Sequence, residues 1–566
     1  MKMNKFFSSS VFLFFCVALA ACLRLWNLGS LPPALSPDEA SLGYNSYSIL
    51  KTGRDEYGKF MPIIFKSFGD YKPGLYVYAS VPFVAILGLT EWAVRLPSAL
   101  SGVLIVILVY KIILHLTSTF NKDRWLISNG QLLANLSAFC AAVSPWLIFF
   151  SRGAWEANVA LTLTLAGIYF FLVGFKYPLY FLLSSLHFAL TLLTYQGAKL
   201  STLIVIFVLM AVFWRDFWKL ARNQAKTITA SSILFLLIAS PAITSFFQGE
   251  TGRLKVFSVF SYPRPKEYLD DFLNQAKVGR EDLNYYFYYS EALNLTRGVM
   301  GRWFNHFSGR FLFFEGDYQN PRHSSPNHGM LLLTDLLFLP LGIIFLLKAK
   351  SKKLATFILL WLVLSPFPAA LSRDQVQSVR ALNLAIPLII ISSFGLCRIL
   401  DWIKTKNLVF PYYILLTTYY LLPFVYFLDS YFTHYSIHNA KYLSYGYKEA
   451  VKTVLDTKDN YGRIVFQQSY AQPYIYFLFY GNWDSGRYQG QAKLSSGGVD
   501  VGLVDRLDNI EFVNFSWPYA TGEKSTLIIG NEIVVPKDFS LSHYNLISEI
   551  KYPDGFSAAF RIVETK

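Results

Sequence analysis

Long apolar runs alternate with short basic segments along most of this chain. A run of about 20 apolar residues is long enough to cross a bilayer as a helix. The pattern therefore predicts about eleven membrane-spanning helices, at residues 8–27, 92–117, 129–150, 156–175, 178–195, 198–214, 228–247, 328–347, 354–371, 381–400 and 408–428. The first run lacks a small-residue cleavage site, which favours an uncleaved first helix over a signal peptide.

The basic clusters between the runs predict the orientation of these helices. Lysine and arginine are enriched in the cytoplasmic loops of membrane proteins. The clusters lie at residues 2–5, 111–124, 176, 215–226, 348–353 and 398–406, in every second connection. This places the N-terminus in the cytoplasm and the C-terminus outside the cytoplasmic membrane. It also predicts two long external loops, at residues 28–91 and 248–327.

One apolar stretch, residues 75–89, does not fit this alternation. Counting it as a span would move every later basic cluster outside, so we expect it to lie along the outer membrane surface. The first external loop then contains two surface helices, near residues 37–51 and 73–87. The alternative, in which residues 75–89 cross the membrane, stays open at this point.

The character of the chain changes after residue 428. A helical pattern at residues 447–455 and strand-like segments at residues 463–467 and 525–529 predict a small α/β domain. We therefore expect a membrane module over residues 1–429 and an extracytoplasmic α/β domain over residues 430–566.

Composition narrows the class further. The chain of 566 residues is 54% hydrophobic and only 15% charged, whereas a soluble domain has about 25% charged residues. The net charge of +15 lies in short loops, so it reports topology and does not indicate a nucleic-acid partner. The four cysteines lie within apolar runs, which argues against a disulfide framework.

Charged and polar residues collect where the predicted spans reach the outer face. They include Asp38, Glu39, Asp70, Lys72, Arg95, Arg152, Glu156, Tyr195, Gln196, Lys199, Arg373, Asp374 and Arg380. Charge is costly near a bilayer, so this grouping predicts one polar cavity. Such a cavity suits a lipid-linked anionic substrate. Its cations would hold a phosphate, and its carboxylates would act on a hydroxyl or bind a metal.

Structural roles remain open for each of these residues. Ser36-Pro37-Asp38-Glu39 has the form of a helix capping box, in which Glu39 closes the cap and Asp38 is left to face a substrate. A carboxylate at a helix N-terminus is kept ionised by the helix dipole. Anchoring at the interface or at a helix end is the alternative for Lys72 and the favoured interpretation for Arg95 and Lys199, and structural ion pairing is the alternative for Arg152 with Glu156 and for Arg373 with Asp374. Arg380 lies slightly inside a predicted span, which favours a functional role.

The order of these motifs resembles a known family. The matching segments are residues 36–40, 69–73, 93–99, 144–152 and 372–380, within a resemblance that covers residues 8 to 430. They are similar to the membrane glycosyltransferases of the GT-C fold, family 39 type, which are related to protein O-mannosyltransferases and lipid A aminoarabinose transferases. The resemblance implies a polyprenyl-phosphate-linked sugar donor used on the non-cytoplasmic face. It also implies that Asp38 is the catalytic carboxylate, that Lys72 contacts the donor phosphate, and that Glu156 or Asn158 occupies a substrate position.

The sequence thus predicts a glycosyltransferase that moves a hexose or pentose to a lipid, glycan or protein acceptor. Asp38 and Glu39 are the candidate catalytic carboxylates, and a divalent metal ion near Asp38 is left open. The candidate phosphate-binding residues are Lys72, Arg380, Arg152 and Arg373, and the candidate substrate-binding residues are Asp70, Glu156, Asn158, Gln196 and Lys199. Two rival functions remain: a flippase for lipid-linked sugars, and an oligosaccharide polymerase or ligase.

Overall fold

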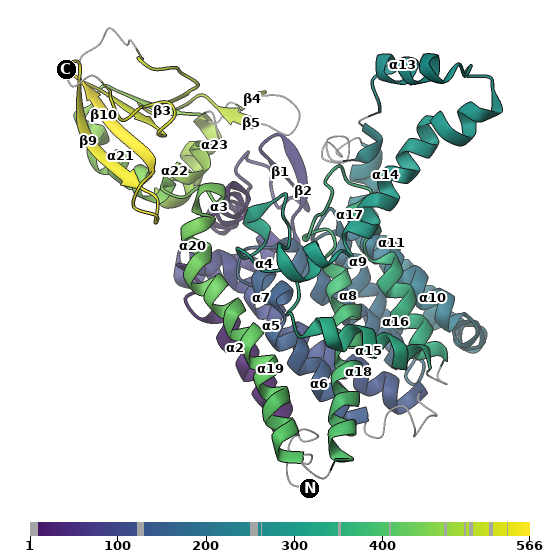
Figure 1. Ribbon diagram of the computed structural model, residues 1–566. Coiled ribbons are helices and arrows are strands. Elements are labelled where there is room, and N and C mark those ends of the chain that lie inside the picture. The colour runs from purple at the N-terminus through teal and green to yellow at the C-terminus, as the bar shows by residue number, and fades with distance from the viewer. Residues whose placement is uncertain are drawn as a thin grey trace.

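The computed structural model describes residues 10–120, 130–248, 258–261, 263–348, 352–406, 409–468, 472–491, 494–496, 502–519, 525–539 and 542–566. Most of these residues form a helical bundle, and a small sheet domain follows at the C-terminal end (Figure 1). The sheet domain lies at one end of the bundle, beside helix α3 (Pro37–Thr52) and the hairpin of β1 (Ile64–Ser67) and β2 (Asp70–Pro73). We call this end, which carries α3, β1–β2 and the sheet domain, the capped end.

The bundle helices coincide with the predicted apolar runs. They are α2 (Ser10–Leu25), α5 (Glu91–Phe120), α6 (Gly130–Val143), α7 (Pro145–Ser151), α8 (Glu156–Gly174), α9 (Tyr180–Leu192), α10 (Ala198–Asn223), α11 (Ala225–Phe247), α15 (Asp335–Leu347), α16 (Lys352–Leu364), α17 (Phe367–Ala370), α18 (Ala385–Lys404) and α19 (Val409–Asp429). In the described ranges, 7 helices are long and apolar enough to cross a membrane, and α6 with α7 forms a bent pair that makes up to 8. The helix set is that of a multi-pass membrane protein.

Two of the predicted spans are shorter helices than expected. The helices within residues 178–195 and 328–347 are α9 and α15, with 13 residues each. Both are apolar but fall below the length of a full crossing. The prediction of about eleven spans therefore holds for the positions of the helices and overstates the length of these two. In the first predicted span, α2 begins at Ser10, the first residue that the structure describes.

The bend between α6 and α7 has a cause in the sequence. Ser144 adopts an extended backbone conformation, and its hydroxyl accepts a hydrogen bond from the backbone N–H of Leu147. Pro145 occupies the first turn of α7, where a missing N–H has no cost. The two helices meet at an angle of 56°, so this predicted span ends in a separate short helix at the capped end.

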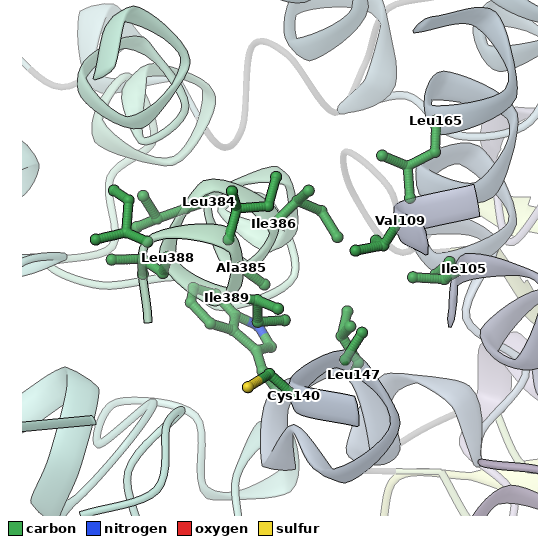
Figure 2. Close-up of a cluster of buried hydrophobic side chains, with 14 of the residues drawn as sticks. Ile105, Val109, Cys140, Leu147, Leu165, Leu384, Ala385, Ile386, Leu388 and Ile389 are labelled. Carbon is green, nitrogen blue, oxygen red and sulfur yellow. The ribbon is translucent and has the colours of Figure 1, made fainter. Parts of the chain in front are cut away.

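The bundle core is built around α18. Figure 2 shows Ala385, Ile386 and Ile389 among side chains from α5, α6, α7 and α8, including Ile105, Val109, Cys140, Leu147 and Leu165. Against α15, two glycines allow direct backbone contact. A Cβ atom on Gly342 would lie 1.9 Å from the carbonyl oxygen of Ile391, and one on Gly395 would lie 2.0 Å from that of Phe338. Small residues of this kind let membrane helices approach closely.

The predicted surface helices in the first long loop are α3 and α4 (Leu75–Leu87). With 13 residues, α4 is about 20 Å long, too short to cross the roughly 30 Å hydrocarbon layer. The antiparallel hairpin β1–β2 lies between them and was not predicted. Phe68 and Gly69 form its two-residue turn, with φ of 52° and 90°, the left-handed values that a tight hairpin turn requires.

The second long loop is largely helical. It contains η1 (Val259–Ser261), α13 (Lys266–Ala276), η2 (Tyr285–Tyr289), α14 (Glu291–Asn305), η3 (Arg310–Phe314) and η4 (Pro321–His323). Figure 1 shows α13 and α14 projecting from the bundle at the capped end. Residues 306–328, by contrast, pack back onto the bundle, with Phe311, Leu312 and Phe313 in its core.

The C-terminal region is an α/β domain, as predicted. After α19 the helical run continues through η6 (Ser430–His434) and α20 (Tyr435–His438), past the expected boundary at residue 429. The rest comprises η7 (Ala440–Tyr442), α21 (Tyr447–Thr457), η8 (Lys458–Asn460), β3 (Arg463–Gln467), α22 (Tyr474–Tyr480), α23 (Ser485–Gln491), β4 (Leu494–Ser496), β5 (Gly502–Val504), β6 (Arg506–Leu507), β7 (Ile510–Val513), β8 (Thr526–Gly530), β9 (Tyr544–Lys551) and β10 (Ala558–Thr565). The main sheet has the order β6-β7-β3-β8-β10-β9, with β3 parallel to both neighbours.

This domain shares a hydrophobic core with the first long loop. The buried cluster joins α3 and α4 to α21, α22 and the sheet. The contact between α3 and α22 is close, since a Cβ atom on Gly43 would lie 2.5 Å from the ring of Phe479. The Tyr476 hydroxyl donates a hydrogen bond of 3.1 Å to the carbonyl of Leu35, just before α3 begins. The domain therefore supports the helix that carries Asp38.

Candidate active site

The N-terminus of α3 holds the two candidate catalytic carboxylates. The Ser36 hydroxyl accepts a hydrogen bond from the backbone N–H of Glu39 (3.2 Å), and the Glu39 carboxylate accepts one from the backbone N–H of Ser36 (2.9 Å). Pro37 occupies the first turn. The capping box expected from the sequence is thus present, and it fixes both acidic side chains on a rigid helix start.

The Glu39 carboxylate makes structural contacts inside the protein. Its Oε1 accepts hydrogen bonds from Arg95 Nε (3.1 Å) and from the backbone N–H of Ala154 (2.9 Å). Arg95 is fully buried and also donates to the carbonyls of Leu28, Pro32 and Ala34. Glu39 therefore ties α3 to α5 and to the turn before α8, and a catalytic role for it stays a prediction. Arg95 is an internal clamp and no interfacial anchor, because no part of it reaches solvent.

Asp38 and Lys72 meet, although 34 positions separate them in the chain. The Lys72 ammonium donates a hydrogen bond to Asp38 Oδ1 and forms an ion pair with it. The Asp38 side chain is 48% exposed, whereas that of Lys72 is 7% exposed. Lys72 reaches this position because the β1–β2 hairpin folds its strand back beside α3. Its ammonium also lies 5.5 Å from the centre of the Phe68 ring.

The pair borders a small pocket between α3 and the hairpin. The pocket is lined by Asp38, Ser41, Leu42, Asn45, Phe65, Ser67, Lys72, Pro73 and Val77. Both sides of the pocket combine polar and apolar side chains. An exposed carboxylate beside a largely buried cation is an arrangement that can bind an anion and accept a proton from a hydroxyl.

The turn between α9 and α10 supports the hairpin from behind. The Gln196 side-chain amide donates a hydrogen bond of 2.9 Å to the carbonyl of Tyr71, next to Lys72. Asp70 is buried, and its charge attracts Lys199 at the start of α10. The structure thus brings Asp70, Gln196 and Lys199 to the same hairpin as Lys72. The contact of Gln196 positions the strand.

Arg152 and Asn158 lie inside the bundle. Arg152 is fully buried, donates to the carbonyls of Leu23 (2.9 Å) and Leu31 (3.2 Å), and packs 4.9 Å from the centre of the Phe432 ring. Asn158 donates to the carbonyl of Ser98 (2.8 Å) on α5 and is also buried. Both side chains therefore contribute to helix packing, and their predicted roles in ligand binding stay predictions. Glu156 begins α8 and is partly exposed beside them.

Arg373, Asp374 and Arg380 share the turn between α17 and α18. Arg380 donates a hydrogen bond of 3.4 Å to Asp374, and both side chains are about one-fifth exposed. Arg373 is exposed. The turn is held by buried Asp317, whose carboxylate accepts hydrogen bonds from the backbone N–H (2.8 Å) and hydroxyl (2.7 Å) of Ser378. Burial acts to raise the pKa of Asp317, but hydrogen bonds from His323, Ser378 and Asn320 outweigh burial and keep this pKa below its usual range.

A chain of contacts links this turn to α3. Glu39 binds the backbone of Ala154, and the neighbouring Trp155 ring packs edge-on against His323, with 5.2 Å between ring centres. His323 in turn lies 3.5 Å from Asp317. Asp317 was not predicted from the sequence, because a single aspartate in a long loop carries no local signal of burial.

The described residues do not fit the metal site that the sequence leaves open near Asp38. Within the described ranges, no group of three or more His, Cys, Asp or Glu side chains is placed to hold a metal ion. Glu39, the nearest acid in sequence, is already bound by Arg95. We derive no step through a metal.

Solved structures of similar shape supply the fold. No protein-family model and no curated protein matches the sequence. The apo structure of ArnT from Cupriavidus metallidurans matches over 97% of each chain, with 12% identity and a TM-score of 0.51. The chain has the GT-C fold. The undecaprenyl-phosphate-bound form of ArnT matches over 98% of each chain, with 12% identity and a TM-score of 0.49.

An oligosaccharyltransferase from Archaeoglobus fulgidus is similar over 84% of this chain and 63% of its own, with 12% identity and a TM-score of 0.49. The GT-C fold confirms the architecture that the sequence resemblance implied. The narrower resemblance, to family 39, stays a prediction.

Proposed function

We propose that this chain is a membrane glycosyltransferase that moves one sugar from a polyprenyl-phosphate carrier to an acceptor outside the cytoplasmic membrane. The observation that carries the proposal is the Asp38–Lys72 ion pair at the capped end of a GT-C bundle. A half-exposed carboxylate and a cation meet there at a pocket between α3, the β1–β2 hairpin and α4, in a chain that has several helices long enough to cross a membrane. A lipid-linked phosphate could reach such a site while its tail stays among the helices and lipid.

Lys72 would bind the donor phosphate. In the ion pair Asp38 satisfies the ammonium charge, and an arriving phosphate offers the same ammonium a second anion. As the bond between the sugar C1 and the phosphate oxygen breaks, negative charge grows on that oxygen, and a fixed cation stabilises it. Arg380 and Arg373, on the turn between α17 and α18, would be further cations for binding the phosphate.

Asp38 would act as the general base. An acceptor hydroxyl attacks C1 from the face opposite the phosphate, its proton passes to the Asp38 carboxylate, and the phosphate leaves with the bonding pair. This single displacement inverts the configuration at C1. Lys72 keeps Asp38 ionised until substrate binds, because an adjacent positive charge favours the carboxylate form.

The carrier class is supported by the neighbouring fold. ArnT has been solved with undecaprenyl phosphate bound, and we propose a carrier of the same chemical class for this chain. We propose a hexose or pentose as the transferred sugar and a lipid, glycan or protein as the acceptor. The orientation that places the capped end outside the cytoplasm follows from the basic clusters at the other ends of the helices.

The test is direct transfer by the purified full-length protein in lipid nanodiscs. Radiolabelled polyprenyl-phosphate sugars are supplied together with lipid and glycan extracts, and label that leaves the carrier is measured. We expect Asp38→Asn to lower the rate by a factor on the order of 10² to 10⁴, the usual contribution of a general base. Asp554→Asn, in an exposed turn of the sheet domain, is the matched control and should transfer like the natural protein. Full transfer by Asp38→Asn would remove Asp38 from the mechanism.

A further inference from the structure

A buried carboxyl group, Glu56, lies behind the pocket that Asp38 and Lys72 border. Glu56 follows the C-terminus of α3 by four residues. Its Oε1 accepts a hydrogen bond of 3.1 Å from the Asn45 side chain, and its backbone N–H donates one of 3.0 Å to the same side chain. Ser41 also donates to Oε1 (3.5 Å). Ser41 and Asn45 line the pocket, so two hydrogen-bonding side chains connect Glu56 with it.

The C-terminal domain encloses this carboxyl group. Glu56 has no exposed surface, and its Oε2 receives no hydrogen bond from the described part of the chain. Its charged and titratable neighbours are Asp55, Lys72, Tyr44, Tyr57, Tyr474 of α22 and Tyr488 of α23. Gln489 of α23 closes the same contact by donating to the carbonyl of Asp55 (2.9 Å). The tyrosines are neutral, and Asp55 repels a second negative charge.

These surroundings disfavour the charged form of Glu56. Burial raises the pKa of the Glu56 carboxyl group most strongly, and the negative charge of Asp55 raises it further. Hydrogen bonds from Asn45 and Ser41 and the positive charge of Lys72 lower this pKa, but by less than burial raises it. Together they raise the pKa of Glu56 from 4.5 to about 8. At neutral pH the carboxyl group therefore keeps its proton, while Asp38 forms the ion pair with Lys72.

We propose that Glu56 is a positioning residue that, in its uncharged form, holds the Ser41–Asn45 face of α3 and leaves Lys72 to pair with Asp38 alone. This role rests on the proposed function, in which Lys72, paired with one carboxylate, binds the donor phosphate. When Glu56 ionises, Lys72 faces two carboxylates, and an arriving phosphate meets one more negative charge. Phosphate binding then weakens.

The first test measures binding of undecaprenyl phosphate to the purified full-length protein across the pH range on either side of 8. We expect the affinity of the natural protein to fall about tenfold as Glu56 ionises, an effect typical of one added charge near a bound ion. Glu56→Gln keeps the size and an acceptor oxygen but cannot ionise, so its affinity should stay level over the same range.

Glu91→Gln is the matched control for this substitution. Glu91 is also a carboxylate in contact with the C-terminal domain, through an ion pair of 2.7 Å with Lys448, whereas Glu56 accepts hydrogen bonds from Ser41 and Asn45 of the pocket lining. Its variant should keep the alkaline fall in affinity. An equal fall in Glu56→Gln and the natural protein would overturn the role of Glu56 and leave the proposed function standing. Absence of lipid-phosphate binding by the natural protein at any pH would overturn the proposed function and this role with it.

The second test, thermal unfolding, needs no ligand. The folded protein holds a proton on Glu56 that the unfolded chain releases above about pH 4.5, so the folded state binds more protons between pH 4.5 and about 8. Stability contributed by the protonated group is therefore lost as pH rises through this window. The unfolding temperature of the natural protein should fall relative to that of Glu56→Gln between these values and run parallel above them. A constant difference across the window would show that Glu56 is ionised in the fold and overturn the proposal.

Discussion

At the residue scale, the adjacent carboxylates Asp38 and Glu39 have different surroundings. Asp38 and Glu39 differ in sequence position by one, which turns their side chains by about 100° around the helix. Glu39 faces inward, to Arg95 and the backbone of Ala154, whereas Asp38 faces the pocket and Lys72. The helical geometry thus separates a structural acid from a candidate catalytic acid, without any difference in their chemistry.

This separation predicts different results for the two amide substitutions. Glu39→Gln leaves the fully buried Arg95 without a charged partner, a change that typically costs about 3–5 kcal/mol. Asp38→Asn removes a half-exposed charge and keeps an oxygen that can accept a hydrogen bond from the largely buried Lys72, so it should cost less than Glu39→Gln, about 1–3 kcal/mol. Chemical unfolding of the purified proteins measures both. A Glu39→Gln variant as stable as the natural protein would contradict the clamp assigned to Arg95.

At the element scale, the contact between α15 and α18 sets the packing of the bundle. Both helices place a glycine where the other helix's backbone passes, Gly342 beside Ile391 and Gly395 beside Phe338. Lipid is as apolar as the side chains, so close backbone packing is a main source of helix association in a membrane. The same α18 contributes its other faces to the core shown in Figure 2.

A single methyl group at this contact should therefore be harmful. Gly395→Ala would place a Cβ atom 2.0 Å from a backbone oxygen, which cannot move without shifting α15. We expect a loss of about 1–3 kcal/mol, the usual cost of overpacking a core. Gly301→Ala on the projecting α14 is the control, since a Cβ atom there meets nothing within 4 Å. Thermal unfolding that leaves both variants equal to the natural protein would contradict the close approach.

At the scale of the whole molecule, the C-terminal domain and the first long loop form one unit. They share a buried core, and hydrogen bonds from Tyr476 and Gln489 reach both ends of the α3 region. The domain is therefore part of the structure that holds the candidate site. The sheet domain and the pocket lie on the same side of the membrane, because α3 and the β1–β2 hairpin, which line the pocket, are at the capped end together with the sheet domain (Figure 1).

Cysteine labelling in intact cells tests this sidedness. In a background without the four natural cysteines, Phe556→Cys in the sheet domain and Lys51→Cys on α3 occupy exposed positions at the capped end. Both should react with a maleimide that cannot cross membranes. Gln224→Cys, in the exposed turn between α10 and α11, should react only after the cells are permeabilised. The reverse pattern would place the pocket in the cytoplasm.

Sequence alone determined the helices and their caps. Long apolar runs must bury their backbone groups as helices in a membrane, so periodicity and length sufficed to find the bundle. The Ser36 capping box depends on neighbours within four residues and was predicted from them. The start of α7 at Pro145 is equally local, but residues 129–150 form one apolar run, and a single span was predicted there. The β1–β2 hairpin was not predicted. Its Phe68-Gly69 turn is typical of a hairpin, but the apolar run at residues 75–89 is the stronger pattern in this loop.

Tertiary structure decided what each charge does. Arg152 and Asn158 looked like ligand-binding groups from their position at helix ends, and packing turned them inward to carbonyl oxygens. Glu56 and Asp317 gave no signal, since their burial is created by elements hundreds of residues away or by a loop folding back. Local sequence fixes backbone conformation through short-range sterics and hydrogen bonds. Whether an ionisable side chain is charged, and which groups it contacts, depends on the residues that exclude water from it. These residues come together only in the folded protein.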